Sequence, residues 1–108
     1  MNDIKYCEVV NKTDVMENPA GGYVGGIGIE IDWQDGPLGR GDNRVKPNGA
    51  FVETVIAAAK QRIEFYQDGK FGCRENAMAI TKLDEALMWL NKRTADREDR
   101  EVEGTHTA

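Results

Sequence analysis

The sequence predicts an α+β protein, with a small N-terminal antiparallel β-sheet followed by a long antiparallel α-helical hairpin that oligomerises through its helices. Near the N-terminus, apolar residues alternate with small or charged ones, the period of a half-buried strand, at Ile27, Ile29, Ile31 and Trp33. From about residue 50 onward, apolar residues recur at intervals of three and four, as in amphipathic helices. The segment Asp68-Gly69-Lys70 interrupts this pattern, and so short a connection predicts that the two helices pack antiparallel.

The predicted sheet lies within residues 1–37, which end in the turn sequence Gln34-Asp35-Gly36-Pro37. We expect the segment from Ile4 to Val10 to pair with the strand over Ile27 to Trp33, across a loop from Glu17 to Gly22. Residues 38–49 combine glycine, charge and a proline without any periodicity, and they are interpreted as a linker.

The helical hairpin is predicted over residues 50–100, followed by a polar tail over 101–108, all within a single domain of residues 1–108. Asn48 is the expected N-cap of the first helix, which should end near Gln67, and the second helix should begin near Cys73. One stripe on each helix should form the contact between them: Val52, Val55, Ile56, Ala59, Ile63 and Tyr66 on the first, and Asn76, Ile80, Leu83, Leu87, Leu90 and Thr94 on the second.

Charge and composition restrict the classes of partner. The chain has 108 residues and a net charge of −5, so we expect neither a nucleic-acid polymer nor an anionic membrane surface as partner. No apolar run approaches the roughly 18 residues that a membrane span needs. The two cysteines, Cys7 and Cys73, lack metal-binding or redox spacing and are interpreted as reduced thiols of a cytoplasmic protein.

A second row on the later helix indicates an oligomer. Small and basic residues recur every seven positions at Ala79, Ala86, Arg93 and Arg100, with Arg97 beside them. Small residues let another backbone approach closely, and the arginines would then line the remaining gap. The row therefore predicts a basic pocket between subunits.

The length of the helix also favours a shared pocket. Asn76 and Arg93 are 17 residues apart, or roughly 25 Å along a helix, so one chain cannot direct both at the same small ligand. In an antiparallel pair of hairpins, Tyr66 and Asn76 of one chain would face Arg93 and Arg97 of the other. An aromatic ring, an amide and two guanidiniums suit a nucleotide. The pattern leaves a structural alternative open, in which Asn76 fixes the helix register, Tyr66 belongs to the core and the arginines pair with neighbouring carboxylates.

The residue types of the chain give little support for a catalytic function. The chain has no serine and one histidine, His106, which excludes a Ser-His-Asp triad, and a metal site of histidines and cysteines fails on count. We therefore expect no catalytic residue, no metal and no cofactor. Carboxylates on the second helix are similar to the magnesium sites of all-helical nucleotide pyrophosphohydrolases, although the paired glutamates of those enzymes are not reproduced: Asp84, Glu85, Asp96 and Asp99. Such a hydrolase and a protein–protein adaptor without ligand are the two alternatives.

Several segments together resemble the phage anti-Thoeris sponge proteins, whose hairpin is shared with the phage anti-CBASS sponges. The resemblance rests on Cys73 to Asn76, Ala79 to Leu90, Arg93 to Arg97 and Val102 to His106, and Trp33 to Pro37 fits the strand end of the family. Each segment alone is a weak signal, whereas their combined spacing is specific. The first 22 residues add little to it.

The resemblance implies a phage protein that sequesters immune signals in the cytoplasm of an infected bacterium without cleaving them. Members capture the cyclic ADP-ribose isomers of Thoeris that carry a ribose–ribose glycosidic link (glycocyclic ADP-ribose), and some hold CBASS cyclic di- or trinucleotides in separate pockets of a hexamer. A dimer or a hexamer is therefore expected. The implied signal pocket contains Tyr66, where a phenylalanine is expected, with Asn76, Arg93 and Arg97, and candidates for the second pocket are Arg100, Gly104, Thr105 and His106.

Overall fold

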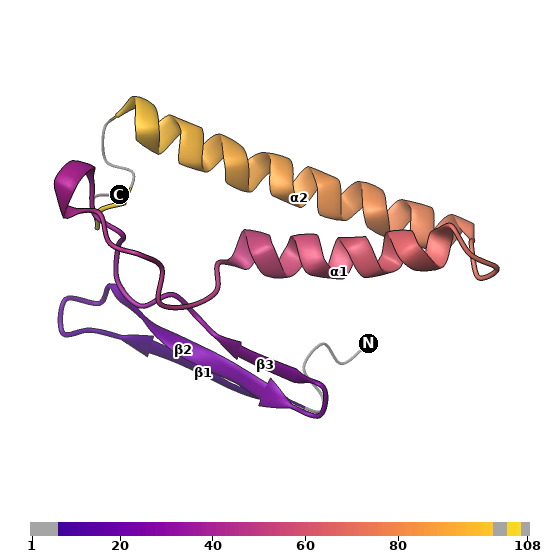
Figure 1. The fold of residues 1–108 in the computed structure, drawn as a ribbon, viewed down its shortest axis with the longest axis horizontal. Coiled ribbons are helices and arrows are strands. Elements are labelled where there is room, and N and C mark those ends of the chain that lie inside the picture. The colour runs from indigo at the N-terminus through magenta and orange to yellow at the C-terminus, as the bar shows by residue number, and fades with distance from the viewer. Residues whose placement is uncertain (1–6, 101–103, 107–108) are drawn as a thin grey trace. The chain divides into compact units, whose positions relative to one another are not determined.

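A computed structural model describes residues 7–100 and 104–106 (Figure 1). The described residues form two compact units: residues 7–51 with 104–106, which contain a three-stranded sheet, and residues 52–100, which form a hairpin of two helices. The predicted α+β class, with a small antiparallel sheet followed by a helical hairpin, is confirmed. That residues 1–108 act as a single domain stays a prediction.

The sheet consists of β1 (Cys7–Thr13), β2 (Pro19–Gly26) and β3 (Ile29–Asp32). The strands lie in the order β1-β2-β3, and each is antiparallel to its neighbour. The central strand therefore pairs on both sides, with Val24 opposite Val9 on β1 and opposite Ile31 on β3.

The central strand corrects the predicted pairing. Residues 19–22, which we expected in a loop, belong to β2. Strand β1, the described part of the first predicted strand, therefore pairs with β2 and not with β3, the strand that we expected as its partner. The glycines of this segment suggested a turn, but in β2 glycine allows two strands to approach closely. A Cβ atom on Gly22 would clash with the backbone carbonyl oxygen of Val10 on β1.

The third strand is shorter than the alternating pattern suggested. Ile27 and Gly28 form the turn between β2 and β3, where Gly28 adopts a φ of 78°. Ile27 is 101% exposed in this turn, so its place in the apolar alternation does not reflect a buried strand position.

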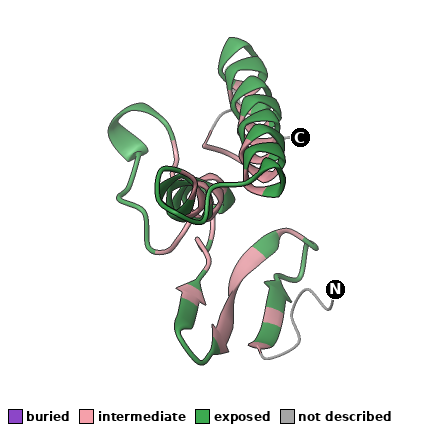
Figure 2. Cartoon of the chain, turned by 90° about the vertical axis from the view of Figure 1, so that its right-hand side faces the viewer, coloured by how far each residue is buried: buried purple, intermediate pink, exposed green. Residues whose placement is uncertain are grey.

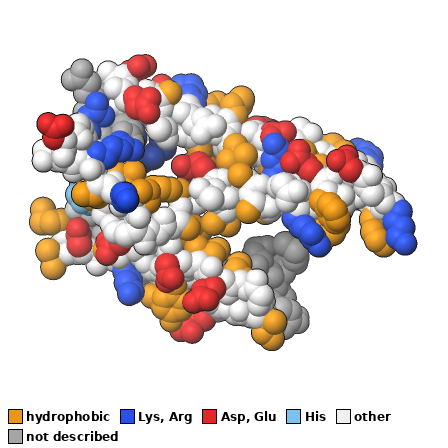
Figure 3. Space-filling model, viewed as in Figure 1, with side chains coloured by type: hydrophobic (Ala, Val, Ile, Leu, Met, Phe, Trp, Pro, Cys, Tyr) orange, Lys and Arg blue, Asp and Glu red, His pale blue; other side chains and the backbone are white. Residues whose placement is uncertain are grey.

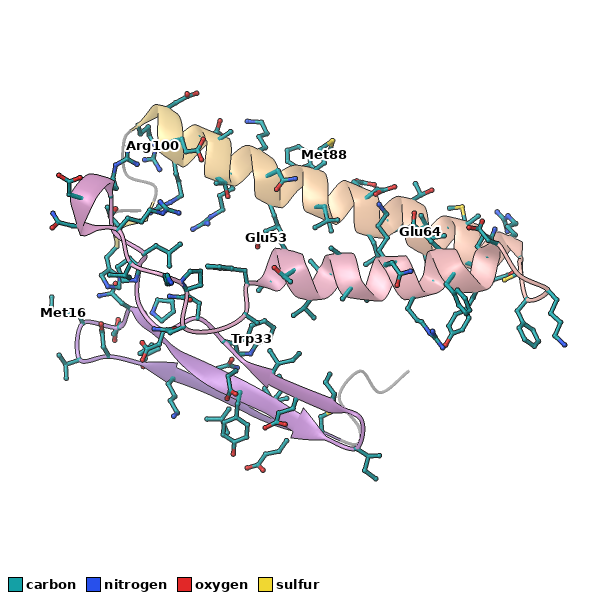
Figure 4. The ribbon with its side chains drawn as sticks, viewed as in Figure 1. Met16, Trp33, Glu53, Glu64, Met88 and Arg100 are labelled. Carbon is teal, nitrogen blue, oxygen red and sulfur yellow. The ribbon has the colours of Figure 1, made fainter. Side chains whose placement is uncertain are left out.

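The connection from β1 to β2 is organised by the carboxylate of Asp14. Its Oδ1 atom accepts hydrogen bonds from the backbone amides of Met16 and Asn18, at 2.8 and 2.9 Å. The backbone amide of Asn18 is the main cause that holds the pKa of Asp14 below its ordinary value, and the amide of Met16 acts in the same direction. Figure 4 shows Met16 at this turn, where its side chain is 77% exposed.

The predicted linker is held to the end of the sheet by two amide side chains. Gln34 Oε1 accepts hydrogen bonds from the backbone amides of Asn48 and Gly49, at 2.9 and 3.2 Å. The side chain of Asn48 in turn accepts from the backbone amide of Asp35 at 2.8 Å and donates to its carbonyl oxygen at 2.9 Å. The prediction that Asn48 is the N-cap of the first helix is therefore wrong, because its side chain closes the loop that follows β3.

The hairpin consists of α1 (Val52–Gln67) and α2 (Arg74–Asp99), within two residues of the predicted bounds. Cys73 is the N-cap of α2, where its Sγ atom accepts a hydrogen bond from the backbone amide of Asn76 at 3.4 Å. Gln67 Oε1 accepts from the backbone amide of Cys73 at 2.9 Å and so joins the end of α1 to the start of α2. In the described part of the chain, neither helix is long and apolar enough to cross a membrane.

The stripe predicted for α2 is half-buried along its whole length, at Asn76, Ile80, Leu83, Leu87, Leu90 and Thr94. The stripe predicted for α1 is partly wrong. Val55, Ile56 and Ile63 are half-buried as expected, but Val52, Ala59 and Tyr66 are exposed, and their place on the contact face is taken by Glu53, Lys60 and Gln67.

The polar residues on this face of α1 have a physical reason. Lys60 forms an ion pair with Asp84 on α2, and the hydrogen bond to Asp84 is the main cause that raises the pKa of Lys60. Figure 4 shows Glu53 on the side of α1 that faces α2. Long charged side chains can cover apolar surface with their aliphatic stems while their head groups reach the edge of the contact. Apolar periodicity alone therefore identifies only part of the contact face.

No residue in the described ranges is fully buried, as Figure 2 shows. A hairpin of two helices buries one stripe on each helix, and its other apolar residues stay at the surface. Val52 is 49% exposed, Met88 55% and Trp89 58%. Figure 3 shows hydrophobic side chains reaching the surface between charged ones, and Figure 4 shows Met88 pointing away from α1.

The loop after β3 provides a test of this local structure. We predict that Asn48→Ala lowers the free energy of unfolding by about 1–2 kcal/mol, because it removes the two side-chain hydrogen bonds to Asp35. Urea denaturation at a fixed protein concentration measures this change. Lys46→Ala, an exposed substitution in the same segment, is the matched control. Equal midpoints for the two variants would contradict the assigned role of Asn48.

Candidate functional site

The first candidate site lies at the turn end of the hairpin and includes Asn76. Two hydrogen bonds orient Asn76 at the start of α2. Its backbone amide donates to Cys73 Sγ, and its side-chain Nδ2 donates to the carbonyl oxygen of Phe71 at 3.2 Å. Asn76 is half-buried. Its Oδ1 atom accepts no hydrogen bond from the described residues, so the amide is oriented and keeps one acceptor.

Tyr66 occupies the last turn of α1, close to the same turn. Its side chain is 41% exposed and therefore lies at the surface, which contradicts the alternative that it belongs to a core. Arg62 Nε donates to the Tyr66 hydroxyl at 3.0 Å, and the guanidinium carbon lies 4.8 Å from the centre of the Tyr66 ring. The same carbon lies 4.9 Å from the centre of the Phe65 ring, which is 59% exposed. The sequence reasoning missed Arg62, although its spacing of four residues from Tyr66 is a usable signal.

Arg93 and Arg97 lie towards the other end of α2. Arg93 is exposed and Arg97 is half-buried. The unbroken helix keeps Asn76 and Arg93 17 residues apart, a separation of roughly 25 Å. A single hairpin therefore does not bring the four predicted residues together. It places an aromatic ring and an amide at one end of α2 and two guanidiniums towards the other.

Three of the carboxylates considered for a magnesium-dependent hydrolase form ion pairs with lysines. Asp84 pairs with Lys60, Glu85 with Lys82 at 3.7 Å, and Asp96 with Lys92 at 3.0 Å. Over residues 7–100 and 104–106, no group of three or more histidine, cysteine or acidic side chains could hold a metal ion. These pairs favour the interpretation of the carboxylates as a charged surface.

The second candidate site forms where the C-terminal segment meets the predicted linker. The backbone amide of Gly39 donates to the carbonyl oxygen of Gly104 at 2.7 Å, and Arg44 Nη1 donates to the Gly39 carbonyl oxygen at 3.4 Å. Gly104 adopts a φ of 79°, and a Cβ atom there would clash with the Gly39 carbonyl oxygen, so glycine is required. Thr105 and His106 follow directly.

The sequence reasoning missed Arg44, because the linker lacks the periodicity that would have related it to the tail. The predicted loose tail is tied to the linker at Gly104, whereas residues 101–103 and 107–108 lie outside the described residues. Arg100 caps the end of α2, where its backbone amide donates to the carbonyl oxygen of Asp96 at 3.2 Å. It belongs to the helical unit, whereas Gly104, Thr105 and His106 belong to the sheet unit.

Comparison with known proteins finds similarity to a phage protein. Thoeris anti-defense 1 of Bacillus phage SBSphiJ7 is 64% identical over 59 residues, which cover 55% of this chain and 42% of that protein. The chain thus spans less than half the length of this relative.

A family model described as "Acb2/Tad1, hairpin domain" matches residues 26–95, from the end of β2 through most of α2. The matched range contains Tyr66, Asn76 and Arg93, whereas Arg97 and the tail residues follow it. The match confirms the family resemblance carried by the segments around Cys73 and Arg93. Because it covers more than half of the sequence, the chain belongs to the Acb2/Tad1 hairpin family.

Proposed function

We propose that this chain is a phage anti-defence protein that captures a cyclic nucleotide immune signal and holds it without cleaving it. The observation that carries the proposal is the distribution of binding groups along a family hairpin. Tyr66, in the last turn of α1, and Asn76, in the first turn of α2, lie at the turn end of the hairpin. Arg93 and Arg97 lie towards the other end of α2. A second hairpin packed antiparallel would complete a pocket at each end.

The turn end suits the nucleoside part of such a ligand. The ring of Tyr66 is exposed enough for a base to stack on it. The Oδ1 atom of Asn76 is an oriented acceptor for an amine or a hydroxyl group, because Nδ2 of the same amide is fixed on Phe71. The guanidiniums of Arg93 and Arg97 from the second chain would bind the phosphates, for which their planar, forked donors are suited.

Exposed apolar residues on the outer side of α2 support assembly into a dimer or a hexamer. Met88 and Trp89 are more than half exposed, and exposed aromatic and methionine side chains are enriched at protein interfaces. A second copy would cover surface that one hairpin leaves in water. Closure around the ligand would also lower the local dielectric constant and strengthen each contact to phosphate.

The proposed ligand is glycocyclic ADP-ribose, which the family resemblance implies, and the phage relative is named for anti-defence against Thoeris. The proposed location is the cytoplasm of the infected bacterium. A sponge, a hydrolase and a protein–protein adaptor give different results when the ligand is incubated with the protein. We predict that the protein binds glycocyclic ADP-ribose tightly and that heat denaturation releases it unchanged. Chromatography of the supernatant measures this. Cleavage products would support the hydrolase, and the absence of binding in calorimetry would support the adaptor.

Subunit mixing tests the shared pocket. We predict that Asn76→Ala weakens binding by about 10-fold and Arg93→Ala by about 10- to 100-fold, since both residues act on the ligand. Both variants should stay folded: Arg93→Ala should unfold at the native temperature, whereas Asn76→Ala should unfold at a slightly lower one, because it loses the hydrogen bond to Phe71. When the two variants are unfolded together and reassembled, about a quarter of the sites should regain full affinity, because each mixed dimer has one intact site. Calorimetry counts these sites. No recovery, or a monomer in light scattering, would contradict a pocket built from two chains.

A second ligand class is favoured by the contact between the C-terminal segment and the linker. Arg44 lies beside Gly104, at 3.4 Å from the position of a Cβ atom on that glycine, and we propose that this cluster binds the phosphates of cyclic di- or trinucleotides. The predicted second-pocket residues Gly104, Thr105 and His106 would contribute backbone and side-chain donors.

For this cluster we predict that Arg44→Gln weakens binding of a cyclic trinucleotide by about 10-fold, because a charged donor to phosphate is lost. The affinity for glycocyclic ADP-ribose should stay unchanged, since Tyr66 and Asn76 belong to the other unit. Calorimetry with both ligands measures the two effects, and Lys46→Gln is the control on the same segment. If Arg44→Gln and the native protein bind the trinucleotide with equal affinity, this assignment of the second pocket is wrong.

A further inference from the structure

Arg62 has an arrangement that hairpin packing does not require. Its guanidinium carbon lies 4.8 Å from the centre of the Tyr66 ring and 4.9 Å from that of Phe65. The two ring centres are 6.0 Å apart and their planes are inclined by 59°, so both rings offer a face to the same cation. All three side chains are exposed, and none lies on the half-buried stripe of α1.

A hydrogen bond fixes the orientation of this guanidinium. Its Nε atom donates to the Tyr66 hydroxyl at 3.0 Å. The two terminal nitrogens, Nη1 and Nη2, donate to no acceptor among the described residues. A guanidinium that is bound through Nε presents its terminal N–H groups as a planar fork, the geometry that matches two oxygens of a phosphate.

The surroundings of the Arg62 charge also differ from those of three lysines of the hairpin. Lys60, Lys82 and Lys92 each form an ion pair with a carboxylate of α2. Within the described ranges, no carboxylate lies at ion-pair distance from Arg62, and the positive charge rests against two aromatic rings. Aromatic faces hold a cation without neutralising it, so the charge stays available to an anion.

We propose that Arg62 is a third guanidinium of the signal pocket, contributed by α1, which binds the diphosphate of the ligand while the base stacks on Tyr66. This inference rests on the proposed function. The cation covers one face of the Tyr66 ring, which leaves the opposite face for the base. Arg62 and the Tyr66 hydroxyl therefore determine on which side of the ring the diphosphate lies.

The test is a double-mutant cycle, measured by calorimetry with glycocyclic ADP-ribose at two salt concentrations. Arg62→Gln should weaken binding by about 10- to 30-fold and reduce its salt dependence, because one charged contact to phosphate is lost. Arg62→Lys should restore part of the affinity, since it keeps the charge without the fork. Lys82→Gln, which removes a surface charge elsewhere in the hairpin, should have no effect.

The second arm of the cycle separates positioning from stacking. Tyr66→Phe keeps the ring and removes the oxygen that accepts the hydrogen bond from Arg62 Nε. It should weaken binding about 3-fold in the native background and leave affinity unchanged in the Arg62→Gln background. Additive effects of the two substitutions would overturn the positioning role of the hydroxyl, although not the contact of Arg62 with phosphate.

The outcomes also distinguish this inference from the proposed function. If the native protein binds glycocyclic ADP-ribose and Arg62→Gln binds it equally well, the role of Arg62 is wrong and the sponge proposal stands. Tighter binding by Arg62→Gln would show that the guanidinium blocks the ring. If the native protein binds none of the cyclic nucleotides, both proposals fail. Because Arg62 is exposed, thermal unfolding of the variants should match that of the native protein.

Discussion

The geometry of the hairpin depends on one constraint: two helices can bury only one stripe on each other. In α1 that stripe contains Ile56 and Ile63, and between them Lys60, whose charge is matched by Asp84 on α2. The half-buried stripe, which includes this pair, defines the side of α1 that faces α2. As a result, the row with Val52 and Tyr66 turns outward, and the aromatic ring at the turn end becomes a surface feature.

A second consequence follows from the length of α2. Its 26 residues span about 39 Å, so groups at its two ends cannot meet around one small molecule. If the ends of two antiparallel copies form each site, ligand binding and assembly are the same event. The ligand would then stabilise the oligomer by mass action, because it binds only the assembled form. An amide that is oriented before binding, such as that of Asn76, would also reduce the entropy lost on the proposed capture.

The sequence was sufficient for the features that depend on local periodicity and on the ends of helices. The bounds of both helices, the contact stripe of α2 and the antiparallel sheet followed from such patterns. The family was also accessible, because several short segments keep a joint spacing over a long part of the chain.

Features that depend on contacts between distant segments were not predictable. Residues 19–22 of β2 were predicted as a loop because glycine is typical of turns, whereas Gly22 serves the close approach of two strands. Asn48 has the residue type of an N-cap, yet its partner is Asp35, 13 residues earlier in the chain. Of the candidate site residues, Asn76 was proposed from its position at a helix start, whereas Arg44 becomes a candidate only when the chain returns to Gly39 and Gly104.

The proposal that an acidic chain binds an anionic signal presents an apparent contradiction, which local pairing resolves. On the hairpin, Lys60, Lys82 and Lys92 are paired with carboxylates, so these pairs contribute little net field at short range. Arg62 is held by two aromatic rings and a phenolic oxygen, none of which cancels its charge. The net charge of −5 describes the field far from the protein, while a ligand at contact distance meets individual guanidiniums. The tyrosine at position 66, where the family resemblance leads one to expect phenylalanine, is then more than a conservative exchange, because its hydroxyl supplies the oxygen that orients Arg62.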